Sequence, residues 1–474
     1  MDRRERGYLA LVVLIALGLR LYYICQPMRY DEAFGFLFFF SQPLSFSLSH
    51  YIAPNNHLLY NLFAHPLYVL LGDSEWVMRI PSFLFGLLLI PAGYYLISSL
   101  FNKESGLLSA VLLATSSLLI EYSTNARGYT LYLLLAIVFF YSIELIFKKQ
   151  KGGWVYFILS ATLGLYTIPV MVYPIIVGLF WFLTRIIQDR FKKHKIKMLI
   201  ISMIIVSLLS LGLYLPVILQ SGLASIFANR FVSLGCSFGF IEDLPRYLSN
   251  LWSSWMRDFP GWDRLALVLA LFVGTVGSKE LRKKYISILI PSVLAIMSIL
   301  FLSRKIPPQR VFMFLIPLYF GAVSSALVYI FKCDFKKVLF RIIVISITLF
   351  LSFAVIKEGA VIKSEETGTL SGAEDLVLFL KGRLKEGDNV LCFMPVDFIL
   401  AYYFNHYSIS WSYLGADLKT TERVFIVLKK GQDLSSLLEK NNLPSFLNNS
   451  KYITSFKDAN LYSYLDFKST LLQF

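Results

Sequence analysis

The sequence predicts a polytopic α-helical membrane protein that carries a small α/β domain at its C-terminal end. The chain of 474 residues is 57% hydrophobic and only 16% charged, and its mean hydropathy is +0.64. Soluble domains average about 45–50% apolar and roughly 25% charged residues, so this composition excludes an ordinary soluble protein. Apolar runs long enough to cross a bilayer recur along most of the chain, and basic residues gather in alternate loops between them.

About eleven segments meet the criterion for a membrane span, which is about 20 apolar residues for roughly 30 Å of hydrocarbon. The segments are 8–26, 77–100, 106–124, 128–147, 153–167, 170–187, 196–217, 263–278, 285–302, 309–331 and 337–356. Segments 153–167 and 263–278 are short, and the orientation of everything after them depends on counting them correctly.

The basic residues predict the orientation of the chain, because Lys and Arg accumulate in short cytoplasmic loops. If the start with Arg3, Arg4 and Arg6 is cytoplasmic, every second loop should be basic. The basic loops lie near 103, 148–151, 185–197, 279–284 and 332–337. An odd number of spans then places the C-terminal domain outside the cytoplasm, with loops 27–76, 121–127, 218–262 and 303–308. We therefore predict a multi-pass protein of the cell membrane, whose net charge of +15 reflects topology and membrane lipids and needs no nucleic acid.

The chain divides at about residue 356 into a membrane domain, 1–356, and a water-soluble α/β domain, 357–474. The second part lacks long apolar runs and shows the short periodic segments of a soluble fold. Its predicted elements are a helix over 372–386, strands over 389–394 and 423–430, a helix over 433–441 and a hairpin of YITSF and LYSYL. We expect this extracytoplasmic domain to hold one modest core of its own.

Two acidic residues, Asp31 and Glu32, follow the first span and precede the aromatic run AFGFLFFF. Carboxylates at the outer end of a helix among apolar residues should be partly desolvated, which increases their basicity and suits a general base. The alternative is that both are solvated loop acids paired with Arg29. Both interpretations fit the residues.

A second group of ionisable residues is expected at the outer boundary of the membrane, in LLIEYSTNARGYTLYLLL. Its loop is so short that Glu121, Arg127 and Tyr129 must lie close to the ends of two helices. Ionisable residues at that depth usually mark a site or a partner. Glu121 could therefore act in a site, or it could pair with Arg127 to close the loop.

A third group lies in SRKIPPQRVF, where Arg304, Lys305 and Arg310 are positive charges in a predicted outer loop. Basic residues in an outer loop are exceptions to the positive-inside rule, so their presence there needs a functional or structural explanation. Arginine suits bidentate contact with phosphate oxygens. The alternative is contact with lipid headgroups, above all for Lys305.

Two histidines lie on one face of a predicted amphipathic helix in the first outer loop, which would lie along the membrane surface. His57 and His65 are separated by about 12 Å along such a helix, which is too far for one metal ion. We interpret them as hydrogen-bonding groups and expect His57, with Asn56 beside it, to contact substrate. No motif indicates a metal or another cofactor, although a divalent ion is compatible with the chemistry.

Outer carboxylates, outer guanidinium groups and an outer α/β domain together suit a reaction on a lipid-linked phosphate. A sugar that leaves a lipid phosphate needs a deprotonated acceptor and a stabilised departing anion. A carboxylate and Arg or Lys can fill these two roles.

Three stretches resemble the membrane glycosyltransferases of the GT-C superfamily, nearest to the protein O-mannosyltransferases and the aminoarabinose transferase of lipid A. They are MRYDEAF, NNHLLYNLFAHPLYVLLGDSEWVMRIPSFLFG and EYSTNARGYTLYLLL. The resemblance is strongest over residues 8–147 and returns in RVFMFLIPLYF and in the C-terminal domain. No WWDYG-like stretch occurs in the tail, which argues against an oligosaccharyltransferase, and WSSWMRD at 252–258 is a poor match in the wrong place.

The resemblance implies a GT-C fold, a polyprenyl-phosphate sugar as donor and inversion at the anomeric carbon. It also implies that Asp31 and Glu32 form the catalytic acidic pair and that Arg127 and Arg310 contact the phosphate. We expect Asp31 to deprotonate the acceptor, Glu32 or Glu121 to orient it, and Lys305 to assist the arginines. The donor sugar, a hexose or a pentose, and the acceptor, a lipid, a glycan or a protein, stay open.

Two other functional classes are weighed against this enzyme. A transporter or flippase of a charged lipid would show repeats and polar groups near the middle of the bilayer. Here the spans are nearly uncharged in their middles and the charges gather at the outer side. In a third class, a non-catalytic membrane scaffold, the outer carboxylates would have no role in catalysis.

Overall fold

The computed structural model describes residues 3–187, 191–227, 239–259, 261–303, 306–331, 337–366, 368–415, 421–441, 443 and 445–465. Its contacts divide the chain into two compact units. The helical unit comprises Met1–Ile24, Ser45–Phe63 and Arg79–Ile362, and the mixed unit comprises Cys25–Leu44, Ala64–Met78 and Lys363–Phe474. Two segments of the first predicted outer loop thus belong with the C-terminal part of the chain.

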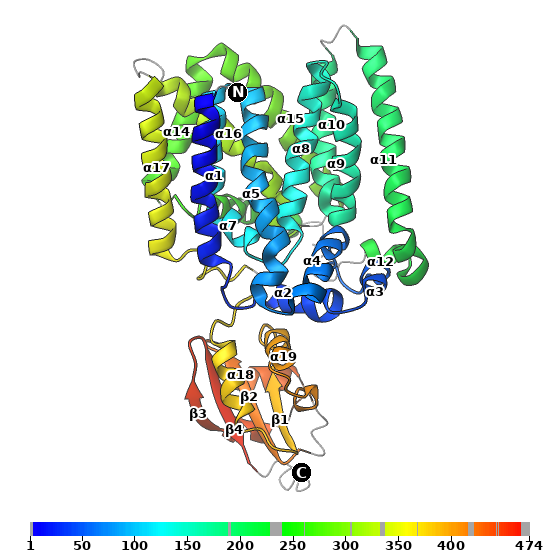
Figure 1. Cartoon of the computed structure of the whole chain (residues 1–474), viewed down its shortest axis with the longest axis vertical. Coiled ribbons are helices and arrows are strands. Elements are labelled where there is room, and N and C mark those ends of the chain that lie inside the picture. Colours follow the sequence, from blue (N-terminus) through cyan, green and yellow to red (C-terminus); the bar gives the residue numbers. More distant parts are fainter. Residues whose placement is uncertain are drawn as a thin grey trace. The chain divides into compact units, whose positions relative to one another are not determined.

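Each of the eleven predicted spans is helical in the structure, and the long helices run side by side (Figure 1). The corresponding elements are α1 (Arg3–Tyr23), α5 (Glu75–Leu100), α6 (Lys103–Thr115) with α7 (Ser117–Ser123), α8 (Tyr129–Phe147), α9 (Gly153–Thr167), η2 (Pro169–Met171) with α10 (Val172–Ile186), α11 (Lys192–Ser221), α14 (Trp262–Gly277), α15 (Lys279–Ser303), η3 (Gln309–Leu315) with α16 (Ile316–Phe331), and α17 (Lys337–Glu358). Within the described residues, seven helices are long and apolar enough to cross a membrane, or eight if a bent pair counts as one span. The count of eleven stays a prediction.

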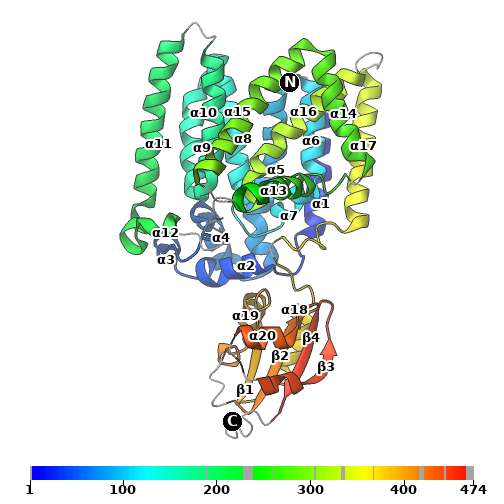
Figure 2. The same cartoon turned by 180° about the vertical axis from the view of Figure 1, so that it is seen from behind.

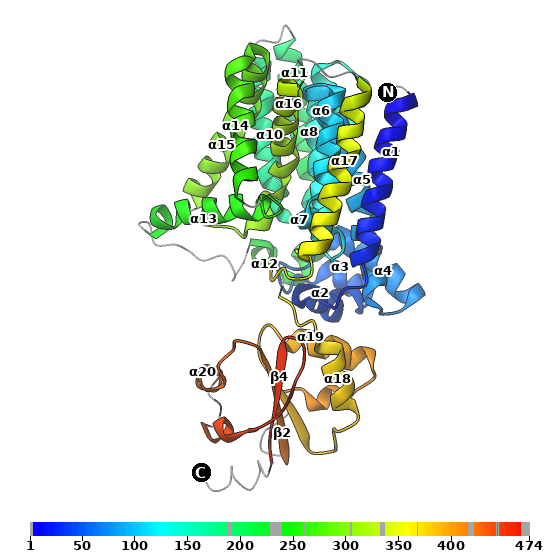
Figure 3. The same cartoon turned by 90° about the vertical axis from the view of Figure 1, so that its left-hand side faces the viewer.

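Shorter helices complete the chain between these spans. They are α2 (Tyr30–Gly35), η1 (Phe36–Phe40), α3 (Leu44–Ser49), α4 (Leu58–Leu71), α12 (Leu223–Phe227) and α13 (Gly239–Trp255). Figures 2 and 3 show α13 lying crosswise to the long helices. Its apolar residues Leu244 and Leu251 are buried in the main hydrophobic core, as expected for an amphipathic helix.

The core of the helical unit forms around α8 and α16. In the most apolar stretch of each span, 72% of the residues are buried inside the protein for α8 and 83% for η3 with α16, against 22% for α11. A helix that is apolar on all sides is stable either inside a protein or against lipid. α8 and α16 therefore form the inner layer, and α11 presents most of its surface outward.

The predicted span 106–124 is not one straight helix. α6 and α7 meet at Ser116 with a bend of 62°, because Ser116 has an extended backbone with ψ of 117°. The side chain of Asp258 accepts a hydrogen bond from the backbone N–H of Ser117 at 2.8 Å, so an N-terminal donor of α7 is satisfied. Sequence periodicity missed this break because every residue around it is apolar or small.

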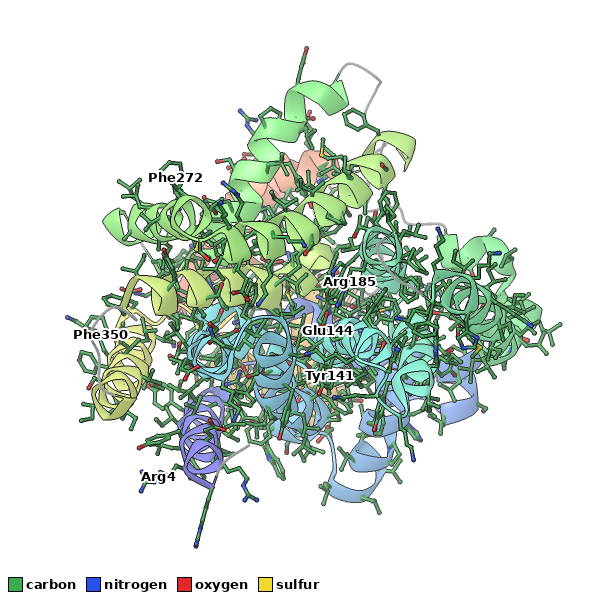
Figure 4. The ribbon with its side chains drawn as sticks, turned by 90° about the horizontal axis from the view of Figure 1, so that it is seen from above. Arg4, Tyr141, Glu144, Arg185, Phe272 and Phe350 are labelled. Atoms are coloured by element: carbon green, nitrogen blue, oxygen red, sulfur yellow. The ribbon has the colours of Figure 1, made fainter. Side chains whose placement is uncertain are left out.

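Three of the basic positions predicted to be cytoplasmic, Lys103, Lys148 and Arg185, lie at the end of the helical unit where α1 begins. Glu5 forms an ion pair with Lys103 at 3.0 Å, and Lys148 donates to the carbonyl of Ser99 at 2.8 Å. Arg185 pairs with Glu144, and Figure 4 looks onto this end, with Arg4, Glu144 and Arg185 labelled. These described basic residues therefore share one end of the helical unit, while the side of the membrane that they occupy stays a prediction.

The mixed unit contains a four-stranded sheet in the order β1-β2-β4-β3. Its elements from residue 373 on are α18 (Ala373–Lys381), β1 (Asp388–Cys392), α19 (Asp397–His406), η4 (Trp411–Tyr413), β2 (Arg423–Lys429), α20 (Leu434–Lys440), η6 (Ser445–Asn449), β3 (Lys451–Ser455) and β4 (Ala459–Tyr464). β1 and β2 pair parallel, and the other pairs are antiparallel. Figure 3 shows α18 and α19 on one face of the sheet and α20 on the other.

The predicted strands and the hairpin of the C-terminal domain are confirmed, with two differences. The predicted helix 372–386 ends at Lys381, because Gly382 and the following turn leave the helix. The helix α19 was not predicted, and its sequence DFILAYYFNH is too apolar and aromatic to show a clear helical period. Its residues Ile399 and Leu400 are buried.

We predict that Gly86→Ala destabilises the helical unit. A Cβ atom at Gly86 would lie 2.6 Å from the Cβ of Ser123, so α5 and α7 would be forced apart. Overpacking of this kind costs about 1–3 kcal/mol and should lower the melting temperature in detergent. Gly212→Ala in α11, where nothing lies within 4 Å, is the matched control and should leave the melting temperature unchanged or higher. Equal melting temperatures for the two variants would contradict the packing described here.

Candidate functional site

The acidic pair lies in the first turn of α2, in the mixed unit. Oε2 of Glu32 accepts a hydrogen bond from the backbone N–H of Arg29 at 3.0 Å, and Glu32 is fully buried. An acidic side chain in this position satisfies a free N–H group and suits the positive end of the helix. Asp31 is only half-buried. The two acids are therefore not equivalent, and the alternative of a solvated acidic pair is wrong for Glu32.

The side chain of Arg29 is buried beneath this turn. Its guanidinium donates to Oε1 of Gln26 at 3.2 Å and to the backbone carbonyl of Ser364 at 3.1 Å. It thus ties the start of α2 to the segment that precedes the C-terminal sheet.

Glu121 is completely buried in α7 of the helical unit and forms an ion pair with Arg257. The distance from Nη1 of Arg257 to Oε2 of Glu121 is 2.7 Å, and Nε of Arg257 donates to the hydroxyl of Ser117 at 2.6 Å. The alternative from the sequence, in which Glu121 pairs with Arg127 to close the loop, stays a prediction. A buried carboxylate needs a cation, and here Arg257 supplies it from the loop after α13.

Asp258, next to Arg257, was not predicted either. It holds the amide of Ser117, and burial raises the pKa of Asp258 above its ordinary value of 3.8. The carboxyl group lines a small pocket at the bend, which Thr115, Ser116 and Glu358 also line. The only available signal was the Arg-Asp dipeptide in an outer loop, and a dipeptide alone does not identify its partners.

Arg127, Tyr129 and Arg310 form a cationic cluster at the start of α8 and η3. The Cζ atoms of Arg127 and Arg310 lie 4.8 Å and 5.8 Å from the centroid of the Tyr129 ring. Nε of Arg310 also donates to the Tyr129 hydroxyl at 3.0 Å, and Nη2 of Arg127 donates to Oδ1 of Asn55 at 2.8 Å. The structure therefore brings the two arginines that were expected to contact the phosphate to one ring, that of Tyr129.

His57 is the fourth predicted residue beside this cluster. Its ring lies edge-on to Tyr129 at 5.3 Å, and its Nδ1 accepts a hydrogen bond from the backbone N–H of Gly128 at 2.8 Å. Burial, together with Arg127 and Arg310, holds the pKa of His57 well below 6.5, so the ring is neutral. Because Nδ1 is the acceptor, the proton must be on Nε2.

The Nε2–H group of His57 is buried, and no acceptor for it is present among the described residues. A buried donor without an acceptor is costly and therefore suggests a ligand atom at this position. His57, Arg127 and Arg310 are thus grouped around the ring of Tyr129.

Asn56 and His65, also singled out from the sequence, contact the protein instead. Asn56 donates to the carbonyls of Ser47 and His50 at 2.9 Å and 2.8 Å and so stabilises the loop before α4. Nδ1 of His65 lies 2.8 Å from the carbonyl oxygen of Phe40. His57 precedes α4, so the two histidines do not share one helical face as predicted.

Two remaining predictions concern Arg304 and Lys305, which lie outside the described residues. Among the residues that the structure does describe, no group of three or more His, Cys, Asp or Glu side chains is placed to hold a metal ion.

Comparison with known proteins identifies the fold. The family model of dolichyl-phosphate-mannose-protein mannosyltransferases matches residues 55–214, and no curated protein matches the chain. Among solved structures, ArnT from Cupriavidus metallidurans in the apo state has a TM-score of 0.57 at 14% identity, over 97% of this chain and 98% of that one. The undecaprenyl-phosphate complex of that protein has a TM-score of 0.50 at 15% identity, over 96% and 98%.

The oligosaccharyltransferase from Archaeoglobus fulgidus, in complex with Zn and sulfate, has a TM-score of 0.54 at 12% identity. This match covers 96% of the present chain and 73% of the archaeal one. At these identities the matches show the fold, and they confirm the GT-C fold implied by the sequence resemblance.

We predict that Glu121→Gln and Arg257→Gln each destabilise the protein strongly, and that the double variant is less destabilised than their sum. Removing one partner of a buried ion pair leaves the other charge uncompensated, at a cost of about 3 kcal/mol. The matched control is Glu5→Gln, because the Glu5–Lys103 pair is exposed and should contribute less than about 1 kcal/mol. Denaturation of all four variants measures these differences. If Glu121→Gln were as mild as Glu5→Gln, the assignment of this pair as a structural constraint would be wrong.

Proposed function

We propose that this chain, which has the GT-C fold, is a membrane glycosyltransferase. It transfers a sugar from a polyprenyl-phosphate donor to a lipid, glycan or protein acceptor on the non-cytoplasmic face of the membrane, with inversion at the anomeric carbon. The cluster of Arg127, Arg310 and the neutral His57 is the observation that carries the proposal.

This cluster matches the chemistry of a departing lipid phosphate. Guanidinium groups donate charge-assisted hydrogen bonds to phosphate oxygens, and the Nε2–H of His57 adds a neutral donor. As the bond between the sugar and the phosphate breaks, negative charge develops on the phosphate oxygens, and donors already in place stabilise it. The Cupriavidus protein binds undecaprenyl phosphate, which supports the same class of donor here.

Asp31 is the proposed general base. Its carboxylate takes the proton of the acceptor hydroxyl or amine while the acceptor atom forms a bond to the anomeric carbon. The bond from that carbon to the phosphate oxygen breaks on the opposite side, and its electron pair stays with the lipid phosphate. Asp31 suits this role better than Glu32, because Glu32 is buried and holds the amide of Arg29.

In this proposal Glu32 and Glu121 have structural roles: each stabilises a segment that carries a functional residue. Glu32 closes the first turn of α2, and Glu121 with Arg257 holds α7, from which the chain enters the loop with Arg127. A direct role of Glu32 or Glu121 in orienting the acceptor stays a prediction.

We expect Arg127→Ala and Arg310→Ala to weaken binding of undecaprenyl phosphate by about 10- to 100-fold each, because each removes hydrogen bonds to a charged group. Binding to the protein in nanodiscs measures the effect, and undecaprenol, which lacks the phosphate, should bind all variants alike. Arg246→Ala is the matched control, since Arg246 is an exposed arginine of α13. Unchanged affinity for undecaprenyl phosphate in both cluster variants would contradict the phosphate site.

We expect Asp31→Asn to lower transfer by about 10²- to 10⁴-fold, the usual contribution of a general base. The measurement is mass spectrometry of glycolipids and glycoproteins from a strain that lacks the protein, complemented with each variant. Asp375→Asn, which changes an exposed acid of α18, should restore wild-type products. Full product from a well-folded Asp31→Asn protein would rule out Asp31 as the base, and an unchanged glycan profile in the deletion strain would rule out the transferase.

A further inference from the structure

We propose that α19 of the C-terminal domain is a positioning element for Asp31, with Phe398 as its central residue. The inference rests on the proposed function, in which Asp31 is the base. α19 and the segment that carries Asp31 both belong to the mixed unit.

Phe398 contacts three aromatic rings of the segment that carries Asp31. Its ring centroid lies 5.2 Å from that of Tyr30, 5.0 Å from Phe34 and 5.5 Å from Phe38. These three residues are four positions apart and follow one face of α2 and η1. Asp31 lies between the first two of them, so the rotation of α2 about its axis, and with it the direction of Asp31, depends on this contact.

The backbone before Asp31 is held by the same domain. The N–H of Met28 donates to the hydroxyl of Tyr403 at 3.2 Å, and the N–H of Tyr30 donates to the carbonyl of Gly368 at 3.1 Å. Arg29 forms an antiparallel bridge with Thr369. The aromatic contacts set the rotation of α2, and these hydrogen bonds set its starting point.

α19 also holds the second segment of the first loop. Tyr402 donates to the carbonyl of Asp73 at 2.7 Å, Tyr403 donates to Oε1 of Glu75 at 2.9 Å, and Nδ1 of His406 lies 3.0 Å from Oδ1 of Asp73. One helix therefore contacts both segments of the loop that group with the C-terminal domain.

A catalytic group must be held close to its productive direction, and a misplacement of about 1 Å can cost about 100-fold in rate. The contacts of α19 are the means by which this chain holds Asp31. The helix α19, which the sequence separates from the acidic pair by more than 300 residues, thereby positions the proposed base.

Phe398→Ala tests the inference, with Phe379→Ala as the matched control. Phe379 is a half-buried phenylalanine of the same domain whose ring packs against Phe456, away from α2. We expect Phe398→Ala to lower the glycan product by about 100-fold while binding of undecaprenyl phosphate stays unchanged. Phe398→Tyr, which keeps the ring, should restore most of the product, and Phe379→Ala should behave as wild type.

Hydrogen exchange provides a readout that does not depend on activity. In Phe398→Ala the amides of residues 28–34 should exchange faster than in wild type, while those of β2 keep their protection and report an intact domain. If Phe398→Ala unfolds β2, Tyr403→Phe replaces it, because that change removes only the hydroxyl bonded to Met28 and Glu75. The same acceleration at residues 28–34 and a loss of product of about 10-fold are then expected.

Wild-type product or wild-type exchange at residues 28–34 in a folded Phe398→Ala protein would overturn the inference. An active Asp31→Asn protein would instead overturn the proposed base, and the exchange result would still report whether α19 holds α2. The two failures are therefore distinguishable.

Discussion

The buried carboxylate of Glu121 requires a cation, and Arg257 provides it. The packing of the helical unit around α7 depends on this ion pair. A lone charge in such surroundings would be costly, so the loop after α13 must lie against α7. Arg257 bonds the hydroxyl of Ser117 and Asp258 bonds its amide. The bend at Ser116 is stabilised by these contacts, and the direction in which the chain enters α8 follows from that bend.

The entry into α8 places Arg127 and Tyr129, and η3 brings Arg310 to the same phenol ring. Two guanidinium groups contact one phenol ring, so two like charges lie close together, and their mutual repulsion is unfavourable. A buried neutral histidine whose Nε2–H has no acceptor among the described residues adds to the local cost. Sites that break the usual rules of burial and pairing are commonly functional sites. An anion with several acceptor oxygens would relieve both costs.

A different constraint governs the mixed unit. The acidic helix α2 has six residues, too few to be stable alone, so its conformation must come from tertiary contacts. Aromatic residues on α19 and the strand-like pairing around Thr369 supply them. The two acids therefore differ in their surroundings. Glu32 accepts a hydrogen bond from the backbone at the start of α2, whereas Asp31 is half-buried.

The amino-acid sequence alone predicts the polytopic helical character, the position of each long helix and the strands of the C-terminal domain. These features follow from hydrophobic length, charge distribution and β-branched runs, which are local properties of the chain. Tertiary contacts establish the bend at Ser116, the pairing of Glu121 with Arg257, the protonated nitrogen of His57, the contact of α19 with α2 and the cluster around Tyr129. Each of these depends on which distant residues meet, and a burial or a hydrogen bond between distant residues leaves no period in the sequence.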